Sequence, residues 1–367
     1  MKVPLLDLQA QFRTVEAEVR AAVERALDAQ AYILGPEVIA LEDELASYCG
    51  AAHAVGVSNG SDALVAALMA LGIGAGDEVI VPSFTFFATA GAVARVGARP
   101  VFADIRADTF NLDPDAAAAA ITPNTTAIIP VHLYGQCAEM DALLAIAKRH
   151  ALAVIEDAAQ AIGATDRGRG ACSLGTAGTL SFYPTKNLSG IGEGGMVLTN
   201  DAQLAERLRQ IRNHGQSEQY LHHFIGGNFR LDGIQGAALR VKLKRLSDWT
   251  TARRRHAARY DAAFADGPVT PPAVRPECRH VYHQYTIRST RRDALREHLT
   301  RAGVGTGLYY PLPLHLQPCF AYCGYRKGQL PASEAAAHEA LSLPVFPEMT
   351  VAQQDYVIEQ ALAFNQA

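Results

Sequence analysis

The feature of this sequence that most constrains its fold is a regular alternation of short apolar runs and amphipathic stretches between residues 52 and 200. Short apolar runs are typical of strands buried on both faces, and apolar residues spaced by three and four positions indicate helices. Strands are expected at residues 53–57, 78–81, 100–103, 127–131, 153–156, 179–182 and 195–199, and helices at 62–71, 87–96 and 140–150. The alternation predicts an α/β fold with a mainly parallel seven-stranded sheet, in which functional residues follow the carboxyl ends of the strands.

The pattern changes after Trp249, which suggests a second domain. A long charged helix is expected over residues 231–264, followed by the proline-rich segment 267–276. A smaller α+β section then has a strand at 282–288 and a helix at 291–302. A chain of 367 residues is long enough for two domains. We therefore predict a large domain over residues 1–250, including an N-terminal helical segment, and a small C-terminal domain over residues 251–367.

The charge and the apolar pattern exclude several kinds of partner. The net charge is −4, and the tightest basic cluster, Arg253–Arg255, lies in the expected long helix, where a solvated face is the simplest interpretation. No run approaches the roughly 20 apolar residues of a membrane span, and the N-terminus does not resemble a signal peptide. We expect a cytoplasmic protein that binds neither nucleic acid nor membrane.

Six cysteines are spread along the chain without the spacing of a disulfide framework. Cys278, His280, His283, Cys319 and Cys323 contain zinc-ligand residue types, but they form two distant clusters without a C-x-x-C pair. We predict reduced structural thiols and no metal site.

Three segments combine residue types suited to chemistry with positions after strands. Residues 58–62 (Ser-Asn-Gly-Ser-Asp) lie before a helix, where free backbone N–H groups and the helix dipole favour an anion, although an ordinary helix N-cap explains the same residues. Asp157 and Gln160 follow an apolar strand, where a carboxylate and an amide suit a flat heteroaromatic cofactor. The alternative is that Asp157 merely caps a helix.

The third segment is residues 181–188, which place Lys186 among small and apolar residues. Partial burial lowers the pKa of a lysine and makes its amine nucleophilic, as Schiff-base chemistry requires. An ordinary solvated lysine is the alternative. The following residues 190–195 match G-x-G-x-x-G, but they lead into a strand and not a helix, so we reject dinucleotide binding.

In combination, these segments resemble the DegT/DnrJ/EryC1/StrS family of sugar aminotransferases, a branch of the fold-type I enzymes that use pyridoxal phosphate. The resemblance covers nearly the whole chain in the expected order. Its landmarks are residues 58–64, 82–86, 130–135, 156–160, 181–187, 227–232, 310–315 and 341–344. The family often has histidine where this chain has Tyr309, a difference that bears on the substrate.

The resemblance implies a role for individual residues. Lys186 would bind the cofactor as a Schiff base and carry protons during catalysis, and Asp157 would keep the pyridine nitrogen protonated. The implied cofactor-binding residues are Gly60, Ser61, Phe86, Asp157, Gln160, Ser181, Lys186 and Asn228, of which Asn228 would reach the phosphate in the neighbouring subunit of a homodimer. The implied substrate-binding residues are Tyr183, Arg230 and Tyr310.

The implied reaction is the transfer of an amino group from L-glutamate to a keto sugar linked to a nucleoside diphosphate. Three alternatives remain. A relative could aminate a cyclitol ketone or make an aromatic amine. A dehydratase that uses pyridoxal phosphate is disfavoured because the sugar-deoxygenating enzymes of that kind have histidine in place of Lys186. A catalytically silent sensor or scaffold is disfavoured by the intact set of Lys186, Asp157 and Gln160.

Overall fold

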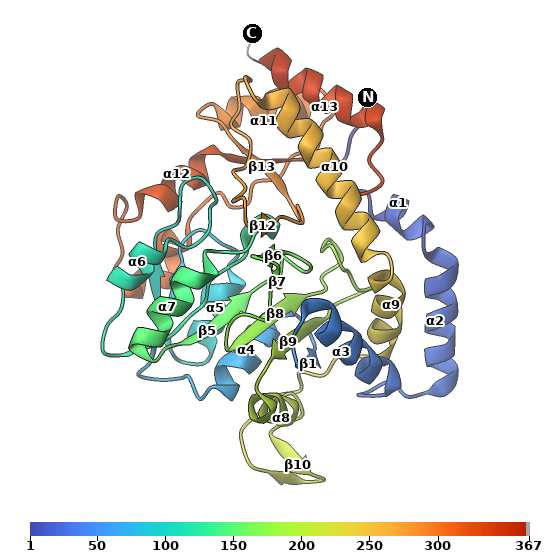
Figure 1. Ribbon diagram of the computed structural model, residues 1–367, viewed down its shortest axis with the longest axis vertical. Helices are drawn as coiled ribbons and strands as arrows, with labels where there is room; N and C mark the ends of the chain where they lie inside the picture. The colour runs from blue at the N-terminus through green and yellow to red at the C-terminus, as the bar shows by residue number, and fades with distance from the viewer. Residues whose placement is uncertain (365–367) are drawn as a thin grey trace.

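Seven strands form one central sheet in the order β1-β9-β8-β5-β4-β2-β3 (Figure 1). The strands are β1 (His53–Val57), β2 (Glu78–Pro82), β3 (Arg99–Ala103), β4 (Thr125–Ile128), β5 (Ala153–Asp157), β8 (Ala177–Ser181) and β9 (Gly195–Thr199). Only β9 runs antiparallel to its neighbours. This computed structural model describes residues 1–364, and it confirms the predicted mainly parallel seven-stranded sheet.

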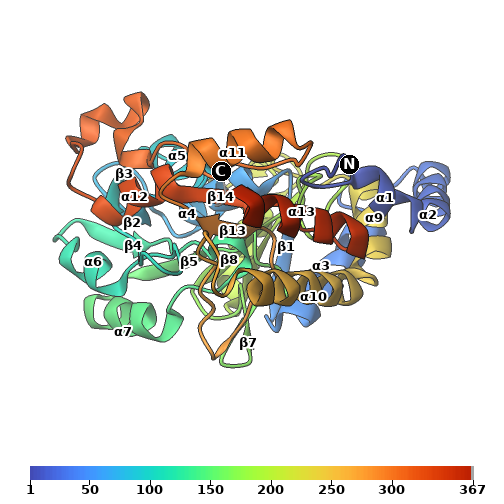
Figure 2. The ribbon, with the colours of Figure 1, turned by 90° about the horizontal axis from the view of Figure 1, so that it is seen from above.

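Helices cover both faces of the sheet, as Figure 2 shows for α5 on one side and α6 and α7 on the other. Val79 and Val81 of β2 join the core on the first face, whereas Ile80 joins the core on the opposite face, as expected for a strand buried on both sides. The first face packs against α4 (Gly60–Ala70), α5 (Ala88–Arg95) and α8 (Ala202–Ile211). The opposite face packs against α3 (Pro36–Cys49), α6 (Pro114–Ala119), α7 (Met140–His150) and α9 (Gly233–Leu243).

A second core lies in the C-terminal section, which α10 (Leu246–Phe264) joins to the sheet (Figure 1). Tyr260, Tyr285 and Phe346 are buried there, and Val3 from the N-terminus packs with them. The section contains the antiparallel pair β13 (Tyr285–Arg288) and β14 (Ala340–Leu343), with α11 (Arg292–Arg301), α12 (Pro331–Glu339) and α13 (Val351–Ala363). Short 3-10 helices occur at Leu133–Gly135, Leu314–Leu316 and Pro318–Cys323.

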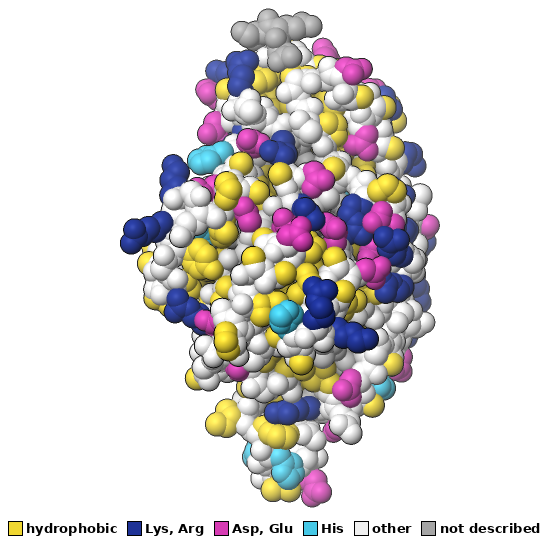
Figure 3. All heavy atoms as spheres, turned by 60° about the vertical axis from the view of Figure 1, so that its left-hand side comes forward, with side chains coloured by type: hydrophobic (Ala, Val, Ile, Leu, Met, Phe, Trp, Pro, Cys, Tyr) yellow, Lys and Arg dark blue, Asp and Glu magenta, His cyan; other side chains and the backbone are white. Residues whose placement is uncertain are grey.

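Two further parts lie outside these cores. The N-terminal helices α1 (Leu8–Arg13) and α2 (Glu16–Ala29) lead into the sheet, and a three-stranded sheet contains β6 (Thr165–Asp166), β7 (Arg169–Gly170) and β12 (Cys278–Arg279). The hairpin of β10 (Gln216–Glu218) and β11 (Leu221–His222) projects from the lower end of the molecule in Figure 1. Hydrophobic and histidine side chains gather at this lower end in Figure 3. Across residues 1–364, no helix combines the length and apolar character needed to cross a membrane.

Two expectations for the long helix at 231–264 are wrong. The helix is divided into α9 and α10 by a turn at Lys244 and Arg245, because α9 packs on α2 and α3 while α10 continues toward the C-terminal core. No glycine or proline marks this turn in the sequence. Arg253 is buried and donates to the carbonyl oxygens of Tyr282 at 3.3 Å and Val345 at 2.7 Å, whereas Arg254 and Arg255 are exposed as expected.

The expected strand at 282–288 begins three residues late, at Tyr285. Tyr282 has a φ of 46°, in the left-handed region that interrupts a strand, and its backbone N–H donates to the His280 ring at 2.8 Å.

Candidate active site

The candidate site lies where β1, β5 and β8 end, at one edge of the sheet. β1 and β8 both run antiparallel to β9, and β5 is parallel to β8, so the three carboxyl ends meet on the same side. The segment after β1 contributes Gly60, β5 ends at Asp157, and β8 ends at Ser181 shortly before Lys186. The structure therefore brings together the three segments that the sequence singled out.

Lys186 lies in the turn after β8, where its backbone N–H donates to the Tyr183 carbonyl at 2.8 Å. Part of its surface remains accessible, but burial lowers the pKa of Lys186 from 10.5 to about 8, against the opposing effect of the Asp157 carboxylate. An amine with this pKa is neutral and nucleophilic in a large fraction of molecules near neutral pH. Lys186 is therefore not an ordinary solvated lysine.

Asp157 is only 5% exposed, and both of its carboxylate oxygens are held. Oδ2 accepts a 2.7 Å hydrogen bond from the Thr89 hydroxyl on α5, and Oδ1 accepts from the Ala159 backbone N–H at 3.2 Å. The residues after Asp157 form turns, so the alternative that Asp157 caps a helix is wrong. The carboxylate is fixed beside Lys186 at the edge of the sheet.

The neighbouring carboxylate of Glu156 has a purely internal set of partners. The Ala138 N–H donates to His132 Nδ1 at 3.1 Å, so the ring proton is on Nε2, which donates to Glu156 at 2.9 Å. Glu156 also accepts from the backbone N–H groups of residues 172, 174 and 175. This buried cluster attaches the segment 132–138 to the end of β5.

Gln160 is buried and has a defined amide orientation. Its Oε1 accepts from the Tyr134 backbone N–H at 2.8 Å, and its Nε2 donates to the Tyr310 hydroxyl at 3.1 Å. Because a backbone N–H can only donate, the amide oxygen must face Tyr134 and the amide nitrogen must face the site. Gln160 therefore presents hydrogen-bond donors to a ligand.

The segment after β1 lies tightly against the end of β8. Asn59 caps α4, since its Oδ1 accepts from the Asp62 N–H at 2.8 Å, which confirms the N-cap interpretation for this residue. A Cβ at Gly60 would lie 2.6 Å from Ser181 Cβ, so only glycine allows this close approach. Gly60 and Ser61 are the first residues of α4, where backbone N–H groups and the helix dipole favour an anion.

The remaining predicted residues lie on exposed surface around these groups. Phe86 and Tyr183 are 55% and 49% exposed, large fractions for aromatic side chains. Asn228 is exposed, and its backbone pairs with Asn213. Arg230 donates to Asn213 Oδ1 at 2.8 Å, and its buried Nε has no hydrogen-bond partner in the part of the chain that the structure describes.

Tyr310 differs from its predicted place at the mouth of the site. Its hydroxyl contacts Gln160, and its ring lies 6.0 Å from that of Phe86. It is therefore deeper than a rim residue.

Sequence reasoning missed residues that support this site. Thr89 has a signal that could have been read, because a hydroxyl interrupts the small apolar residues at the start of α5. Lys242 has none: it is buried on α9, and its Nζ donates to the Ser189 carbonyl at 2.8 Å and hydroxyl at 3.2 Å. Burial lowers the pKa of Lys242 to about 8. Its bonds attach the glycine-rich segment after Lys186 to the helix.

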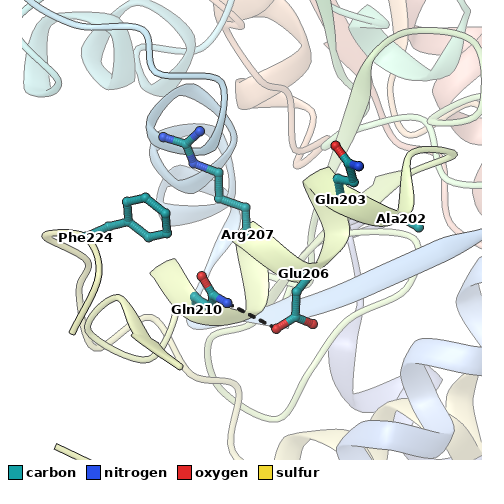
Figure 4. A pocket seen from close by; sticks show the side chains of 6 residues that line it. All are labelled: Ala202, Gln203, Glu206, Arg207, Gln210 and Phe224. Carbon is teal, nitrogen blue, oxygen red and sulfur yellow. Dashed lines mark hydrogen bonds between the residues drawn. The ribbon is translucent and has the colours of Figure 1, made fainter. Parts of the chain in front are cut away.

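A groove of about 380 Å³ lies away from these residues, along α8. Arg207 stacks on Phe224 at 4.8 Å, which holds the end of the β10–β11 hairpin against the helix. The groove contains none of the predicted site residues; its lining is Ala202, Gln203, Glu206, Arg207, Gln210 and Phe224 (Figure 4). It supports the hairpin and has no part in the candidate site.

Comparison with known proteins agrees with the fold and the site. An α/β protein with a buried lysine and carboxylate at this edge of the sheet is an aminotransferase. The chain belongs to the DegT/DnrJ/EryC1/StrS aminotransferase family, whose profile matches residues 13–362. The family uses pyridoxal phosphate, and solved relatives include forms with bound pyridoxamine phosphate.

Three curated relatives cover almost the whole chain. A protein of Geobacillus stearothermophilus named pleiotropic regulatory protein is 54% identical, covering 99% of each chain. The erythromycin biosynthesis sensory transduction protein EryC1 of Saccharopolyspora erythraea is 47% identical, covering 98% of each. The dTDP-3-amino-3,4,6-trideoxy-alpha-D-glucose transaminase of Streptomyces venezuelae is 46% identical, covering 98% of this chain and 95% of that protein.

Solved structures give the same result. The crystal structure of S. venezuelae DesV in complex with a ketimine intermediate has a TM-score of 0.98 and 46% identity, covering 100% of this chain and 99% of that one. The NtdA protein of Bacillus subtilis with bound pyridoxamine phosphate has a TM-score of 0.94 and 33% identity, covering 100% and 86%.

Proposed function

We propose that this aminotransferase binds pyridoxal phosphate through Lys186 and moves an amino group from L-glutamate to a keto sugar linked to a nucleoside diphosphate. The observation that carries the proposal is the buried Lys186, whose pKa falls to about 8 beside the fixed Asp157 carboxylate. The nucleotide-sugar substrate is supported by the printed activity of the S. venezuelae transaminase, which acts on a dTDP-linked sugar.

The residues present fit pyridoxal phosphate. The phosphate would lie at the start of α4, where Gly60 and Ser61 supply backbone N–H groups and Ser181 lies against Gly60. Asp157 would pair with the protonated ring nitrogen, since a buried carboxylate with two fixed oxygens favours a cation. Phe86, exposed in the single chain, would stack on the ring.

The side chains of this protein would handle the protons of the reaction. The bound cofactor supplies an electron sink for the carbon that loses its proton. Lys186 Nζ, once free and neutral, accepts that proton and returns it to another carbon, and a base with a pKa near the working pH does this well. Asp157 stays ionised and holds a proton on the ring nitrogen, and the Gln160 amide donates to the ring oxygen.

Substrate binding is assigned to the rim of the site. Tyr183 offers an exposed aromatic surface, and Arg230 offers a cation for phosphate or carboxylate groups. A nucleotide sugar is large, so an open rim suits it. L-glutamate would use the same site in the first half-reaction.

A homodimer with shared active sites is part of the proposal. Asn228 is exposed on the segment that follows the projecting hairpin, where Tyr220 and Ile225 are 84% and 92% exposed. Exposed apolar side chains at a projecting tip favour burial against a second copy. Mixing inactive Lys186→Ala with inactive Asn228→Asp subunits should restore activity, because one site of each heterodimer combines both intact residues. Heterodimers confirmed by mass spectrometry and without activity would contradict the shared site.

A regulatory role without catalysis is the second candidate, because two of the similar proteins have regulatory names. The intact and poised Lys186 argues against it. Amination of a cyclitol or aromatic ketone also remains open. The cytoplasmic location and the domain boundary near residue 250 stay predictions.

Two experiments test the proposed function. Borohydride reduction of the yellow protein should fix the cofactor on the peptide that contains Lys186, and labelling of any other lysine would contradict the assignment. Incubation with L-glutamate and a panel of keto sugar nucleotides, followed by mass spectrometry, should give an aminated sugar. Cofactor binding without turnover on sugar, cyclitol or aromatic ketones would favour the regulatory candidate.

A further inference from the structure

Gln160 and Tyr310 form a pair whose hydrogen bonds are only partly used within the protein. The amide oxygen of Gln160 is occupied by the Tyr134 N–H, so Nε2 faces Tyr310 and donates one of its two hydrogens to that hydroxyl at 3.1 Å. The Tyr310 oxygen is therefore an acceptor in this contact, and its own proton is free to be donated. Over residues 1–364, the structure gives that proton no acceptor.

The surroundings of Tyr310 keep it in the donor form. Its ring lies between those of Phe84, at 6.2 Å, and Phe86, at 6.0 Å. Burial raises the pKa of Tyr310, the hydrogen bond from Gln160 opposes this, and the negative charge of Asp157 raises the pKa further. Asp157 is thus close enough to affect Tyr310, which places the hydroxyl beside the groups assigned to the cofactor ring.

We propose that Tyr310 is a cofactor contact, and that its hydroxyl and the Gln160 amide form two adjacent donors for the ring oxygen of pyridoxal phosphate. The inference rests on the proposed function. Two free hydrogens on atoms 3.1 Å apart can converge on one oxygen, and donors to a negatively charged oxygen form stronger hydrogen bonds than neutral pairs do. This role differs from the substrate contact that the sequence predicts for Tyr310.

The test uses full-length protein loaded with pyridoxal phosphate and without substrate. The ring oxygen shares a proton with the lysine nitrogen, and each donor draws negative charge away from that oxygen. Tyr310→Phe removes one donor, so the oxygen holds the shared proton more tightly. The midpoint of the pH-dependent visible absorption should move upward by about one pH unit, and the Kd for pyridoxal phosphate should rise about five-fold or more.

Tyr309→Phe is the matched control, because its ring lies 5.8 Å from that of Tyr310 while its side chain has no contact with Gln160 in the described chain. Its midpoint should equal that of the wild type. Gln160→Met removes the partner donor and should move the midpoint in the same direction as Tyr310→Phe. Thermal melting of each variant checks that the fold is kept.

The outcomes separate this inference from the proposed function. An unchanged midpoint in Tyr310→Phe, with a raised KM for the keto sugar nucleotide, would overturn the inference and return Tyr310 to substrate binding. A wild-type protein that does not bind pyridoxal phosphate would overturn the proposed function and the inference together.

Discussion

Replacing Gly60 with alanine tests the proposed phosphate site through a contact that can be measured in the structure. The added Cβ would lie 2.6 Å from Ser181 Cβ and 3.0 Å from Ser181 Oγ. Carbon atoms pack at about 3.5–4.0 Å, so α4 or the end of β8 must move by roughly 1 Å. This movement separates the first N–H groups of α4 from Ser181, the two elements proposed to hold the phosphate.

The magnitude follows from two opposing effects. Overpacking at a tight contact costs about 1–3 kcal/mol, whereas alanine in a helix is favoured over glycine by about 1 kcal/mol. The change in unfolding free energy of the cofactor-free protein is therefore small, at most about 2 kcal/mol. Cofactor binding has no such compensation, and a loss of about 1.4–3 kcal/mol corresponds to a 10- to 100-fold higher Kd for pyridoxal phosphate.

The assay is titration of the cofactor-free protein with pyridoxal phosphate, followed by absorbance, with thermal melting in parallel. Gly74→Ala is the matched control, because the nearest atom to its added Cβ is the Val96 carbonyl oxygen at 3.5 Å, an ordinary contact. Wild-type affinity in Gly60→Ala would refute the assignment of the phosphate to this end of α4.

Three further predictions concern charge at the site. Asp157→Asn keeps the shape but not the charge, so turnover should fall by at least about 100-fold, or roughly 3 kcal/mol of barrier; near-normal kcat would remove this residue from the mechanism. Thr89→Val removes the 2.7 Å hydrogen bond to Asp157 and should destabilise the cofactor-free protein by about 1.5–3 kcal/mol in denaturant unfolding, with most of the loss recovered in Thr89→Ser. Equal stability of the Val and Ser variants would contradict it. Because the pKa of Lys186 is lowered to about 8, capture of pyridoxal phosphate should accelerate as pH rises through about 8 while the amine loses its proton, then level off; stopped-flow absorbance would show a flat profile if the lysine were ordinary.

The sheet and the location of the site could be predicted from the sequence because both depend on local pattern. Val79, Ile80 and Val81 form an apolar run that only a strand buried on both faces explains, and the structure distributes them between the two cores. Parallel strands bring their carboxyl ends to one edge, so Asp157 and Lys186 could be expected near each other before any coordinates.

The departures come from packing that no local pattern encodes. The turn at Lys244 and Arg245 lacks a helix breaker, and it forms because the two flanking helices pack on different cores. Arg253 looks like a surface residue among basic neighbours, but two backbone carbonyls from distant loops accept its hydrogen bonds. Such acceptors become known only when the tertiary fold brings them to the helix.

The place of Tyr310 shows why the partners of the site residues depend on the whole chain. The segment that contains it returns to the sheet through Ser83, whose carbonyl accepts from the Leu314 N–H at 2.7 Å and whose hydroxyl lies 2.6 Å from His315 Nδ1. Ser83 lies just after β2, in the loop that also leads to Phe86. One attachment therefore fixes the C-terminal segment relative to the loop assigned to the cofactor ring, and it brings Tyr310 to Gln160 across 150 positions of sequence. Because this donor pair is completed by a residue beyond position 250, we infer that the large domain alone cannot form the complete site.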